Sequence, residues 1–362
     1  MDAPIRDLQV SAYTIPTESP ESDGTLVWDS TTLVLVQAEA GGKFGTGYTY
    51  AAPAAARVIR DLLTEAVLRI DAMAVPKAWD AMARAVRNVG RPGIASMAIA
   101  AVDTALWDLK ARLLGVPLVA LLGSVRDSIP VYGSGGFTSY SVEQLRSQLQ
   151  DWAGQGIARV KMKVGRNPAE DVPRVQAARE AIGDKPALFV DANGAYSRKQ
   201  ALDKAARFAD FGVCWFEEPV SSDDLEGLRL LRDRAPAGMD IAAGEYGYDS
   251  IYFRRMLEAG AVDCLQADAT RCAGITGFLA VGALCQSYSV ALSAHTAPAL
   301  HLHPCCALPP ACHVEYFFDH VRIERMFFDG CPEPSEGSLR PDLSRPGLGL
   351  EFRKADANRF EV

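Results

Sequence analysis

Short apolar segments recur about every 20 to 30 residues in the second half of this chain, and each contains or precedes charged side chains. Apolar runs of this length are typical of strands buried on both faces, and the intervals leave room for one helix and two loops. The charged residues are Lys161 and Lys163 in ARVKMKV, Asp191 after ALFV, Glu217 after VCWF, Glu245 after DIAAG, Asp268 after VDCLQA, His295 after VALSA and Glu315 after ACHV. The pattern predicts a parallel (β/α) barrel of the TIM type, with these side chains at the carboxyl ends of its strands.

Eight barrel strands can be counted. The first is IPVY at 129–132, and the seven apolar segments supply the rest. Stretches such as SVEQLRSQLQDWAGQG, SRKQALDKAARFADFG and SIYFRRMLEAG lie between them and carry apolar residues at three- and four-residue spacing, as amphipathic helices do. Because such a barrel needs about 200 to 250 residues, we expect it to span 127–330.

The rest of the chain has a different pattern. IRDLQVSAYTI and TTLVLVQAEA alternate apolar and polar residues like half-exposed antiparallel strands, and IASMAIAAVDTALWDLKARLLG predicts a long, tightly packed helix. The C-terminal LGLEFRKADANRFEV predicts a strand and tail. We therefore expect an α+β capping domain at 1–126, to which the C-terminal segment 331–362 returns.

Composition indicates a soluble enzyme. At 362 residues and 49% hydrophobic, the chain can bury a large core. It has no uninterrupted apolar run of about 18 residues, and MDAPIRDLQV lacks the features of a signal peptide. We thus expect a cytoplasmic protein that does not bind membranes. The net charge of −8 disfavours nucleic acid as a partner, although it leaves a small anionic substrate open.

The cysteine pattern raises one alternative. Most of the eight cysteines lie in core-like segments, which suits reduced thiols better than disulfides. One further group could form a zinc site: His301, His303, Cys305, Cys306, Cys312 and His313. Its spacing matches no usual structural zinc pattern because no Cys-x-x-Cys pair is present, so ordinary packing is favoured.

Three carboxylates predict a metal site. Asp191, Glu217 and Glu245 fall at three successive strand ends, and neighbouring strands lie about 4.8 Å apart. A single acid at such a position is more often a loop cap or an ion-pair partner, but three in register can converge on one ion. Oxygen ligands without His or Cys suit Mg²⁺.

Two lysines precede these acids by one barrel repeat. Residues two apart on a strand point the same way, so Lys161 and Lys163 should both enter the barrel mouth while Met162 packs outward. A divalent cation and a second ammonium nearby should lower the lysine pKa towards that of a useful base. The alternative is a solvated lysine pair on an edge strand.

Asp268 and His295 lie at consecutive strand ends. A carboxylate there can accept a hydrogen bond from one imidazole nitrogen, which fixes the tautomer and raises the basicity of the other nitrogen. A lone histidine is usually structural, but this partner favours a catalytic dyad. Glu315, one strand further on, could donate a hydrogen bond if protonated or could neutralise a lysine.

The ordered series VKMKVG, VDANGAY, FEEP, GEY, DAT and SAH, together with the mixed N-terminal cap, resembles the enolase superfamily, specifically its mandelate racemase subgroup. The resemblance covers nearly the whole chain. It implies that Asp191, Glu217 and Glu245 are magnesium ligands, and it favours a symmetric homo-oligomer.

The resemblance also implies the catalytic roles. Lys163 matches the base on one face of the substrate, and Lys161 matches the group that assists the substrate carboxylate. His295 with Asp268 matches the acid/base dyad on the opposite face, and Glu315 matches the hydrogen-bonding partner of the enolate oxygen. This dyad makes the muconate cycloisomerase and dipeptide epimerase branches less expected, because those branches use a lysine there.

Such a site should abstract a proton α to a carboxylate of a small-molecule substrate. We expect dehydration of a sugar acid, an aldonate or aldarate, to a 2-keto-3-deoxy acid, with His295 as general acid. The alternative is a racemase or epimerase of a 2-hydroxy acid. More remote alternatives are a Schiff-base aldolase with Lys163 as nucleophile and a metal-binding barrel without turnover.

Specificity should come from the cap. Two family loops that close over the mouth correspond to 16–30 and 45–52, and the first is rich in Gly, Ser and acids, as either a mobile lid or a solvated loop would be. Trp28, Tyr48 and Tyr50 either wall the pocket or only pack the cap.

Two barrel residues are weaker candidates for substrate binding. Asn193 either orients substrate or a metal-bound water, or simply forms an Asn-Gly turn. Arg271 either binds the distal carboxylate of a diacid or supports Asp268.

Overall fold

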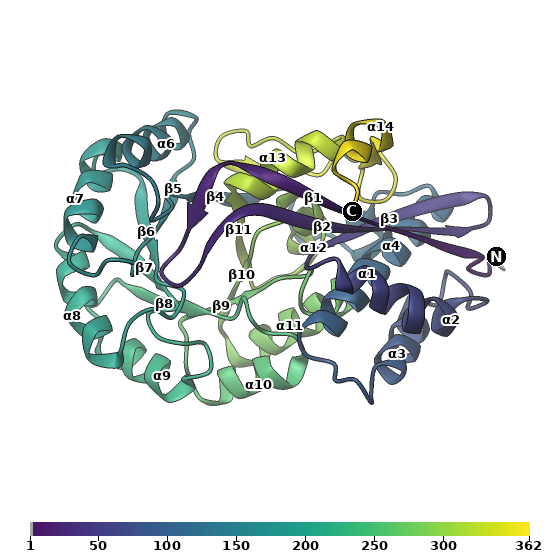
Figure 1. Ribbon diagram of the computed structural model, residues 1–362. Coiled ribbons are helices and arrows are strands. Elements are labelled where there is room, and N and C mark those ends of the chain that lie inside the picture. The colour runs from purple at the N-terminus through teal and green to yellow at the C-terminus, as the bar shows by residue number, and fades with distance from the viewer. Residues whose placement is uncertain (1–2) are drawn as a thin grey trace.

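A computed structural model describes residues 3–362, and its largest element is a closed eight-stranded parallel barrel (Figure 1). The strands are β4 (Ile129–Gly135), β5 (Arg159–Lys163), β6 (Ala187–Asp191), β7 (Val213–Glu217), β8 (Asp240–Ala243), β9 (Cys264–Ala267), β10 (Ala291–Ala294) and β11 (Ala311–Phe317). Each strand pairs with the next, and β11 pairs with β4 to close the barrel. The predicted barrel and its eight strands are confirmed.

Helices surround this barrel and alternate with its strands (Figure 1). They are α6 (Val142–Gly154), α7 (Asp171–Ile182), α8 (Arg198–Ala209), α9 (Leu225–Arg234), α10 (Ser250–Glu258), α11 (Gly274–Tyr288), α12 (Pro298–Ala307) and α13 (Phe318–Phe327). Ser141 and Ser197 start α6 and α8 with capping boxes, which satisfy the free backbone N–H groups of the first turn. Met162 packs outward, as predicted, in the apolar layer that includes Leu145 of α6.

The barrel interior is filled with side chains. Tyr132, Phe189 and Trp215 are buried there, and the rings of Phe189 and Trp215 stack with their centroids 5.0 Å apart. Trp215 lies two residues before Glu217 on the same face of β7, and its Nε1 donates a hydrogen bond to Glu217 Oε2 at 3.0 Å. The aromatic layer therefore supports the charged layer at the strand ends.

The cap contains a three-stranded antiparallel sheet made of β1 (Asp7–Ser22), β2 (Val27–Ala40) and β3 (Lys43–Tyr50). Most of the segment 45–52, which we expected to form a loop, is strand β3. Its glycines allow helix α4 (Ile94–Leu114) to lie directly on the strand: a Cβ on Gly47 would be 2.3 Å from the carbonyl oxygen of Ala101. Close packing, not a turn, explains this glycine-rich composition.

The segment 16–30 is a hairpin rather than an irregular loop. β1 runs to Ser22 and β2 begins at Val27, so only the residues between them form the turn. The hairpin reaches from the cap across the barrel in Figure 1, and the backbone N–H of Thr138 donates to the Ser22 carbonyl at 2.9 Å. Composition suggested a loop because Pro, Ser and acids are rare in strands, but pairing with β2 overrides that preference.

The remaining elements belong to the cap and to the C-terminal segment, in which residues Ser338–Leu339 pair with the barrel strand β4. They are α1 (Ala54–Val58), a π-helical turn (Ile59–Leu63), α2 (Thr64–Val67), α3 (Val75–Ala85), α5 (Leu118–Leu122), β12 (Phe328–Asp329), β13 (Ser338–Leu339), β14 (Glu351–Phe352), α14 (Lys354–Ala357) and a 3₁₀ turn (Asn358–Phe360). The predicted C-terminal strand is only the two residues of β14. At the chain end, the Val362 N–H donates to the Ala12 carbonyl of β1 at 3.0 Å.

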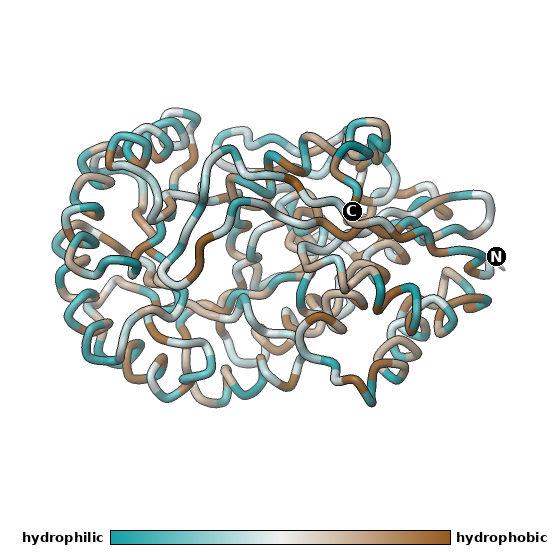
Figure 2. The backbone as a smooth tube through the Cα atoms, viewed as in Figure 1, coloured by the Kyte–Doolittle hydropathy of each residue, from teal (hydrophilic) through white to brown (hydrophobic). Residues whose placement is uncertain are grey.

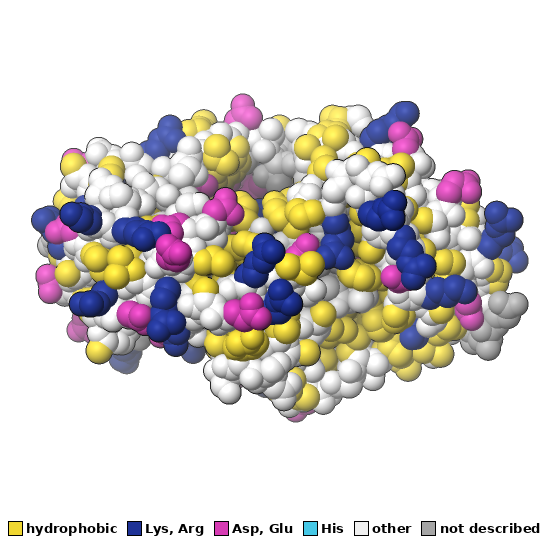
Figure 3. All heavy atoms as spheres, turned by 90° about the horizontal axis from the view of Figure 1, so that it is seen from below, with side chains coloured by type: hydrophobic (Ala, Val, Ile, Leu, Met, Phe, Trp, Pro, Cys, Tyr) yellow, Lys and Arg dark blue, Asp and Glu magenta, His cyan; other side chains and the backbone are white. Residues whose placement is uncertain are grey.

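The surface carries both signs of charge. Hydrophilic and hydrophobic residues alternate along the outer helices in Figure 2, and Lys, Arg, Asp and Glu are interspersed on the face shown in Figure 3. Over residues 3–362, no helix is both long enough and apolar enough to span a membrane.

Candidate active site

Three carboxylates converge at the barrel mouth. Asp191 ends β6, Glu217 ends β7, and Glu245 follows β8 after a single glycine. All three are buried, and each has an oxygen that lies within 4.8 Å of the corresponding oxygens of the others. Among the described residues, Glu245 Oε2 has no hydrogen-bond partner of regular geometry, and its nearest cationic neighbour is His295 Nε2 at 3.3 Å. Buried oxygen donors with a free lone pair fit a hard divalent cation such as Mg²⁺.

The two predicted lysines lie beside this triad. Lys161 is fully buried, and its Nζ is 2.6 Å from Glu217 Oε1, 2.8 Å from Glu315 Oε1 and 3.4 Å from Asp191 Oδ2. Lys163 Nζ donates to Asp191 and, at 3.1 Å, to Asn193 Oδ1. Both ammonium groups enter the mouth, as the alternation along β5 predicted.

The lysine pKa was expected to fall beside a bound cation, and that expectation stays a prediction, because the carboxylates of the protein alone shift the pKa the other way. Burial by itself lowers the pKa of both ammonium groups, but Glu217 and Glu315 raise that of Lys161 well above its ordinary value. Asp191 likewise raises the pKa of Lys163. The expectation considered a metal ion and a second lysine but not carboxylates at hydrogen-bonding distance, so both lysines are charged here.

The acids of the mouth repel one another. Burial, followed by the nearby Asp191, raises the pKa of Glu217 to about 8 even though Lys161 opposes the shift. A buried group of carboxylates is stabilised by any cation placed among them. This repulsion is a second reason why the residues fit a divalent ion.

His295 and Asp268 form the predicted pair. His295 Nδ1 lies 2.9 Å from Asp268 Oδ2, while its Nε2 lies 3.3 Å from Glu245 Oε2 and 3.7 Å from Glu315 Oε2. Burial alone lowers the pKa of the imidazole, but these carboxylates raise it to about 10. His295 is therefore an imidazolium whose Nε2 faces the other charged groups of the mouth.

Glu315 is ionised in this arrangement. It accepts hydrogen bonds from Ser134 Oγ and, at 3.0 Å, from the backbone N–H of Thr296. Burial alone raises its pKa, but Lys161 and His295 lower it to about 2. Of the two expected roles, neutralising a lysine is the one that this geometry favours. The sequence analysis missed Ser134 and Thr296, because neither residue follows the charged pattern.

A cavity of about 400 Å³ opens at the mouth between cap and barrel. Of the weaker candidates, Trp28, Tyr50, Asn193 and Arg271 line it. The cap segments expected to close over the mouth, 16–30 and 45–52, also contribute Asp23, Leu26, Ser30, Ala51 and Ala52. The lining residues that were not predicted are Thr31, Thr32, Tyr246, Thr296, Phe317 and His320.

Tyr48 does not line this cavity, and its assignment as a substrate-binding residue is corrected. Its hydroxyl donates to Glu324 Oε1 at 2.6 Å, and its ring stacks on Phe328 with centroids 5.2 Å apart. Tyr48 thus packs the cap against the end of the barrel. Tyr50, two residues later, reaches the cavity and stacks on His320 with ring centroids 3.4 Å apart.

Asn193 and Arg271 support neighbouring acids. Asn193 has a left-handed backbone (φ 46°), as in an Asn-Gly turn, yet its amide oxygen also accepts from Lys163. Arg271 lies 3.5 Å from Glu245 Oε1 and 3.7 Å from Asp268 Oδ2. Arg271 therefore has the supporting contact with Asp268 that was one of its two expected roles.

The alternative zinc cluster does not form. His301 Nε2 accepts the backbone N–H of Ala269 at 2.8 Å, and His303 Nδ1 accepts that of Val119 at 3.1 Å. Among residues 3–362, the acidic triad is the one group of His, Cys, Asp and Glu found to have metal-binding geometry. These histidines pack the barrel loops.

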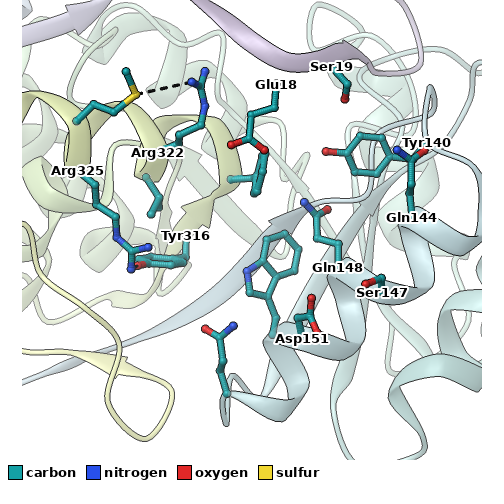
Figure 4. A pocket seen from close by; sticks show the side chains of 15 residues that line it. Glu18, Ser19, Tyr140, Gln144, Ser147, Gln148, Asp151, Tyr316, Arg322 and Arg325 are labelled. Carbon is teal, nitrogen blue, oxygen red and sulfur yellow. Dashed lines mark hydrogen bonds between the residues drawn. The ribbon is translucent and has the colours of Figure 1, made fainter. Parts of the chain in front are cut away.

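A second cavity of about 890 Å³ lies outside the barrel between α6 and α13 (Figure 4). Glu18 and Ser19 of the hairpin form part of its wall. Some of its polar groups are already used, because Gln148 Oε1 accepts the Gly136 N–H at 2.7 Å and Arg325 donates to the Tyr316 hydroxyl at 2.9 Å. It contains no part of the acidic triad or the dyad, so we assign the chemistry to the barrel mouth.

Two family matches cover most of the chain. Residues 11–123 match the mandelate racemase/muconate lactonizing enzyme N-terminal domain, and residues 144–357 match the family described as enolase C-terminal domain-like. The chain belongs to the mandelate racemase/muconate lactonizing enzyme family. The resemblance found in the sequence is thereby confirmed.

Characterised relatives of this family member act on sugar acids. L-Talarate/galactarate dehydratase of Salmonella typhimurium LT2 is 33% identical and covers 95% of this chain and 87% of its own. 3,6-Anhydro-alpha-L-galactonate cycloisomerase of Streptomyces coelicolor is also 33% identical, with coverage of 97% and 98%. Arabinonate dehydratase of Saccharolobus solfataricus is 30% identical, with coverage of 86% and 84%.

Solved structures of the family have the same fold. A mandelate racemase/muconate lactonizing enzyme-like protein from Rubrobacter xylanophilus is 54% identical with a TM-score of 0.97, covering 99% of this chain and all of its own. A racemase from Streptomyces coelicolor A3(2) with bound magnesium is 31% identical with a TM-score of 0.93, covering 99% and 100%. Magnesium is the cofactor of this family member, in agreement with its buried acidic triad.

Proposed function

We propose that this enzyme dehydrates a sugar acid to a 2-keto-3-deoxy acid. The observation that carries the proposal is the placement of two acid/base groups across one cavity. Lys163 ends β5 and His295 directly follows β10. Two barrel strands separate β5 from β10 on one side and four on the other. A substrate between them can lose a proton to one group and accept a proton from the other.

Asp191, Glu217 and Glu245 are the residues that would hold Mg²⁺. When bound, the ion would supply positive charge where negative charge develops on the substrate carboxylate. Lys161 would add a second positive charge at the same end, because its ammonium is fixed by Glu217 and Glu315. These groups would bind and orient the substrate carboxylate.

Lys163 would act as the base. It must be neutral to do so, which requires that its ion pair with Asp191 break in the working complex. The α-proton then passes to Lys163 Nζ and leaves the substrate as an enolate, whose electron pair next forms the bond between the α and β carbons. The bond between the β carbon and its hydroxyl group then breaks, and the hydroxyl group leaves with the bonding electrons.

His295 would act as the acid. Its Nε2 proton joins the departing hydroxide to make water, while Asp268 holds Nδ1–H and keeps the ring in position. The resulting enol takes a proton at the β carbon and loses the proton of its α-hydroxyl group to solvent, which gives the 2-keto acid. Because His295 is protonated in the protein, it is ready for this step.

Racemisation or epimerisation is the second candidate. With no leaving group on the β carbon, the His295 proton would instead return to the α carbon from the opposite face. The similarity to a racemase with bound magnesium supports this alternative. A Schiff-base aldolase is less favoured, because its lysine chemistry does not need the acidic triad that would hold magnesium.

Proton NMR of the magnesium-loaded protein in deuterated water, with a panel of aldonic and aldaric acids, tests the function. We expect a 2-keto-3-deoxy product from at least one acid. Exchange or inversion at the α carbon without loss of water would support the second candidate. Absence of product, exchange and inversion across the panel would overturn both.

We also propose a symmetric homo-oligomer in the cytoplasm. All eight cysteines are free thiols, as a reducing compartment requires, and closed symmetric assemblies are common among soluble enzymes. Sedimentation velocity should give a mass that is a whole multiple of 39.0 kDa and at least twice it. A monomer at micromolar concentration would contradict the assembly.

A further inference from the structure

The cap side of the mouth cavity carries no positive charge. The cap residues that line it are Asp23, Leu26, Trp28, Ser30, Thr31, Thr32, Tyr50, Ala51 and Ala52. Neither lysine nor arginine is among them. The one charged side chain is the carboxylate of Asp23, whose Oδ1 accepts the backbone N–H groups of Thr25 at 2.6 Å and Leu26 at 2.7 Å.

The positive groups that line the cavity all come from the barrel, and each already has an acidic partner. Lys163 pairs with Asp191, and His295 pairs with Asp268. Arg271 lies between Glu245 and Asp268 at 3.5 and 3.7 Å. Positive charge is therefore concentrated at the strand ends, where the reacting carboxylate would bind.

Helix α13 adds a neutral group to the cavity. His320 is 8% exposed, and burial, helped by the charge of His295, lowers the pKa of its imidazole to about 3. Its Nδ1 is buried and has no hydrogen-bond partner within residues 3–362. The small exposed part of this neutral ring therefore brings no positive charge to the cavity.

The arginine of α13 nearest to His320 in sequence faces away from this cavity. Arg322 donates to Asp319 and, at 2.8 Å, to the Pro16 carbonyl, and it lines the outer cavity shown in Figure 4. It is not among the residues that line the mouth cavity. A second substrate carboxylate would thus meet neutral side chains and Asp23, and an unpaired buried charge is costly.

We infer that the substrate is a polyhydroxy acid with a single carboxylate, whose remote end carries hydroxyl groups and no charge. This inference rests on the proposed function and narrows it to aldonates rather than aldarates. The remote hydroxyls would contact His320 and the hydroxyl-bearing residues of the cap wall. The characterised relatives include enzymes named for both kinds of acid, so the family alone does not decide this point.

Matched pairs of acids test the inference. D-Galactonate with galactarate, and D-gluconate with D-glucarate, differ only in whether carbon 6 is a hydroxymethyl group or a carboxylate. The remaining hexonates and their diacids complete the set. For the acids that react, we expect the aldonate to have at least a tenfold higher kcat/KM than its diacid. A diacid that reacts as fast as its aldonate would overturn the inference and leave the dehydratase standing. If no acid loses water or exchanges its α-proton, the proposed function fails, and the inference with it.

A charge placed in the cap wall provides a second test. Ser30 lines the cavity, whereas Val27 is on the same strand, lies outside the lining and is exposed. Ser30→Arg should raise the kcat/KM ratio of diacid to aldonate at least tenfold, and Val27→Arg, which adds the same charge, should leave the ratio unchanged. Equal ratios in both variants would show that the charge of the wall does not select the substrate.

Discussion

Lys161 and Glu217 are joined by two hydrogen bonds, because the lysine Nζ donates to Oε1 at 2.6 Å and to Oε2 at 2.8 Å. Both side chains are fully buried. They come from β5 and β7, so the pair spans the strand that carries Asp191. Glu217 also accepts a hydrogen bond from Trp215, so this pair connects the charged residues at the strand ends to the aromatic residues inside the barrel.

Removing Lys161 should therefore affect both stability and activity. Lys161→Met leaves Glu217 and Glu315 buried without their shared cation, which should lower the free energy of unfolding of the metal-free protein by about 3 to 5 kcal/mol. Urea unfolding monitored by circular dichroism measures the change. Lys199→Met, at an exposed position of α8, is the control. Equal unfolding midpoints for the two variants would show that the buried pair adds no stability.

Substitutions of the two acid/base groups should have different effects on proton exchange and on dehydration. His295→Asn should retain exchange of the substrate α-proton with solvent deuterium but lose dehydration, because only the acid is missing. Lys163→Ala should lose both reactions by a factor of about 10² to 10⁴. Proton NMR measures exchange and product together, and calorimetric magnesium titration verifies that the metal site survives. Dehydration at the wild-type rate in either variant would reject these roles.

Removal of divalent metal should abolish turnover and lower the melting temperature. Magnesium at 100 times its dissociation constant should stabilise the protein by about 2.7 kcal/mol. Asp191→Asn should lose this shift in melting temperature, whereas Asp203→Asn, at an exposed position of α8, should keep it. Activity that persists after chelation would contradict the proposed role of the triad.

The hairpin should contribute a pH-dependent term to stability through Glu21. This carboxyl group is buried and accepts from Trp28 Nε1 at 2.9 Å, and burial, followed by Asp319, raises its pKa to about 8. Because the folded pKa exceeds the unfolded one, its stabilising contribution is complete below pH 4.5 and is lost as the pH rises to about 8.

As the pH rises from 4.5 to about 8, the free energy of unfolding of Glu21→Gln should consequently increase relative to that of wild type. The increase should be at most about 1.4 kcal/mol for each pH unit. Denaturant unfolding at several pH values measures the difference. Glu18→Gln, an exposed position on the same strand, should show no such trend. A difference that does not change with pH would mean that Glu21 is not the titrating group.

The contact between β3 and α4 depends on the absence of a side chain. Gly47→Ala places a Cβ 2.3 Å from the Ala101 carbonyl oxygen, so backbone must move, and we expect a loss of about 1 to 3 kcal/mol. Gly154→Ala, where no atom lies within 4 Å of the added Cβ, is the matched control. Thermal unfolding of both variants gives the comparison.

Periodicity explains why the barrel and its charged layer could be predicted. Each strand end repeats the same local pattern, so the position of Asp268 supports that of His295 even though neither is informative alone. The convergence of such residues then follows from the geometry of parallel strands. Lys161 and Lys163 were placed correctly for this reason, because alternation along β5 is a property of the backbone.

Features that depend on partners distant in sequence could not be predicted. The hairpin at 16–30 was expected to be an irregular loop because composition carries no information about its pairing with β2. Tyr48 and Tyr50 are equivalent in sequence, yet one meets Glu324 and the other His320. The lysine pKa values depend on individual hydrogen-bonding distances, and His320 belongs to no repeat.

The separation between the cap wall and the strand ends has an evolutionary consequence. The residues that would recognise the remote end of the substrate come largely from 23–32, whereas the reacting groups come from 161–315. A new substrate could therefore arise by mutation within one short hairpin while the enolising machinery stays intact. Libraries restricted to that hairpin should yield folded, metal-binding variants with altered substrate preference at a higher frequency than libraries spread over the barrel.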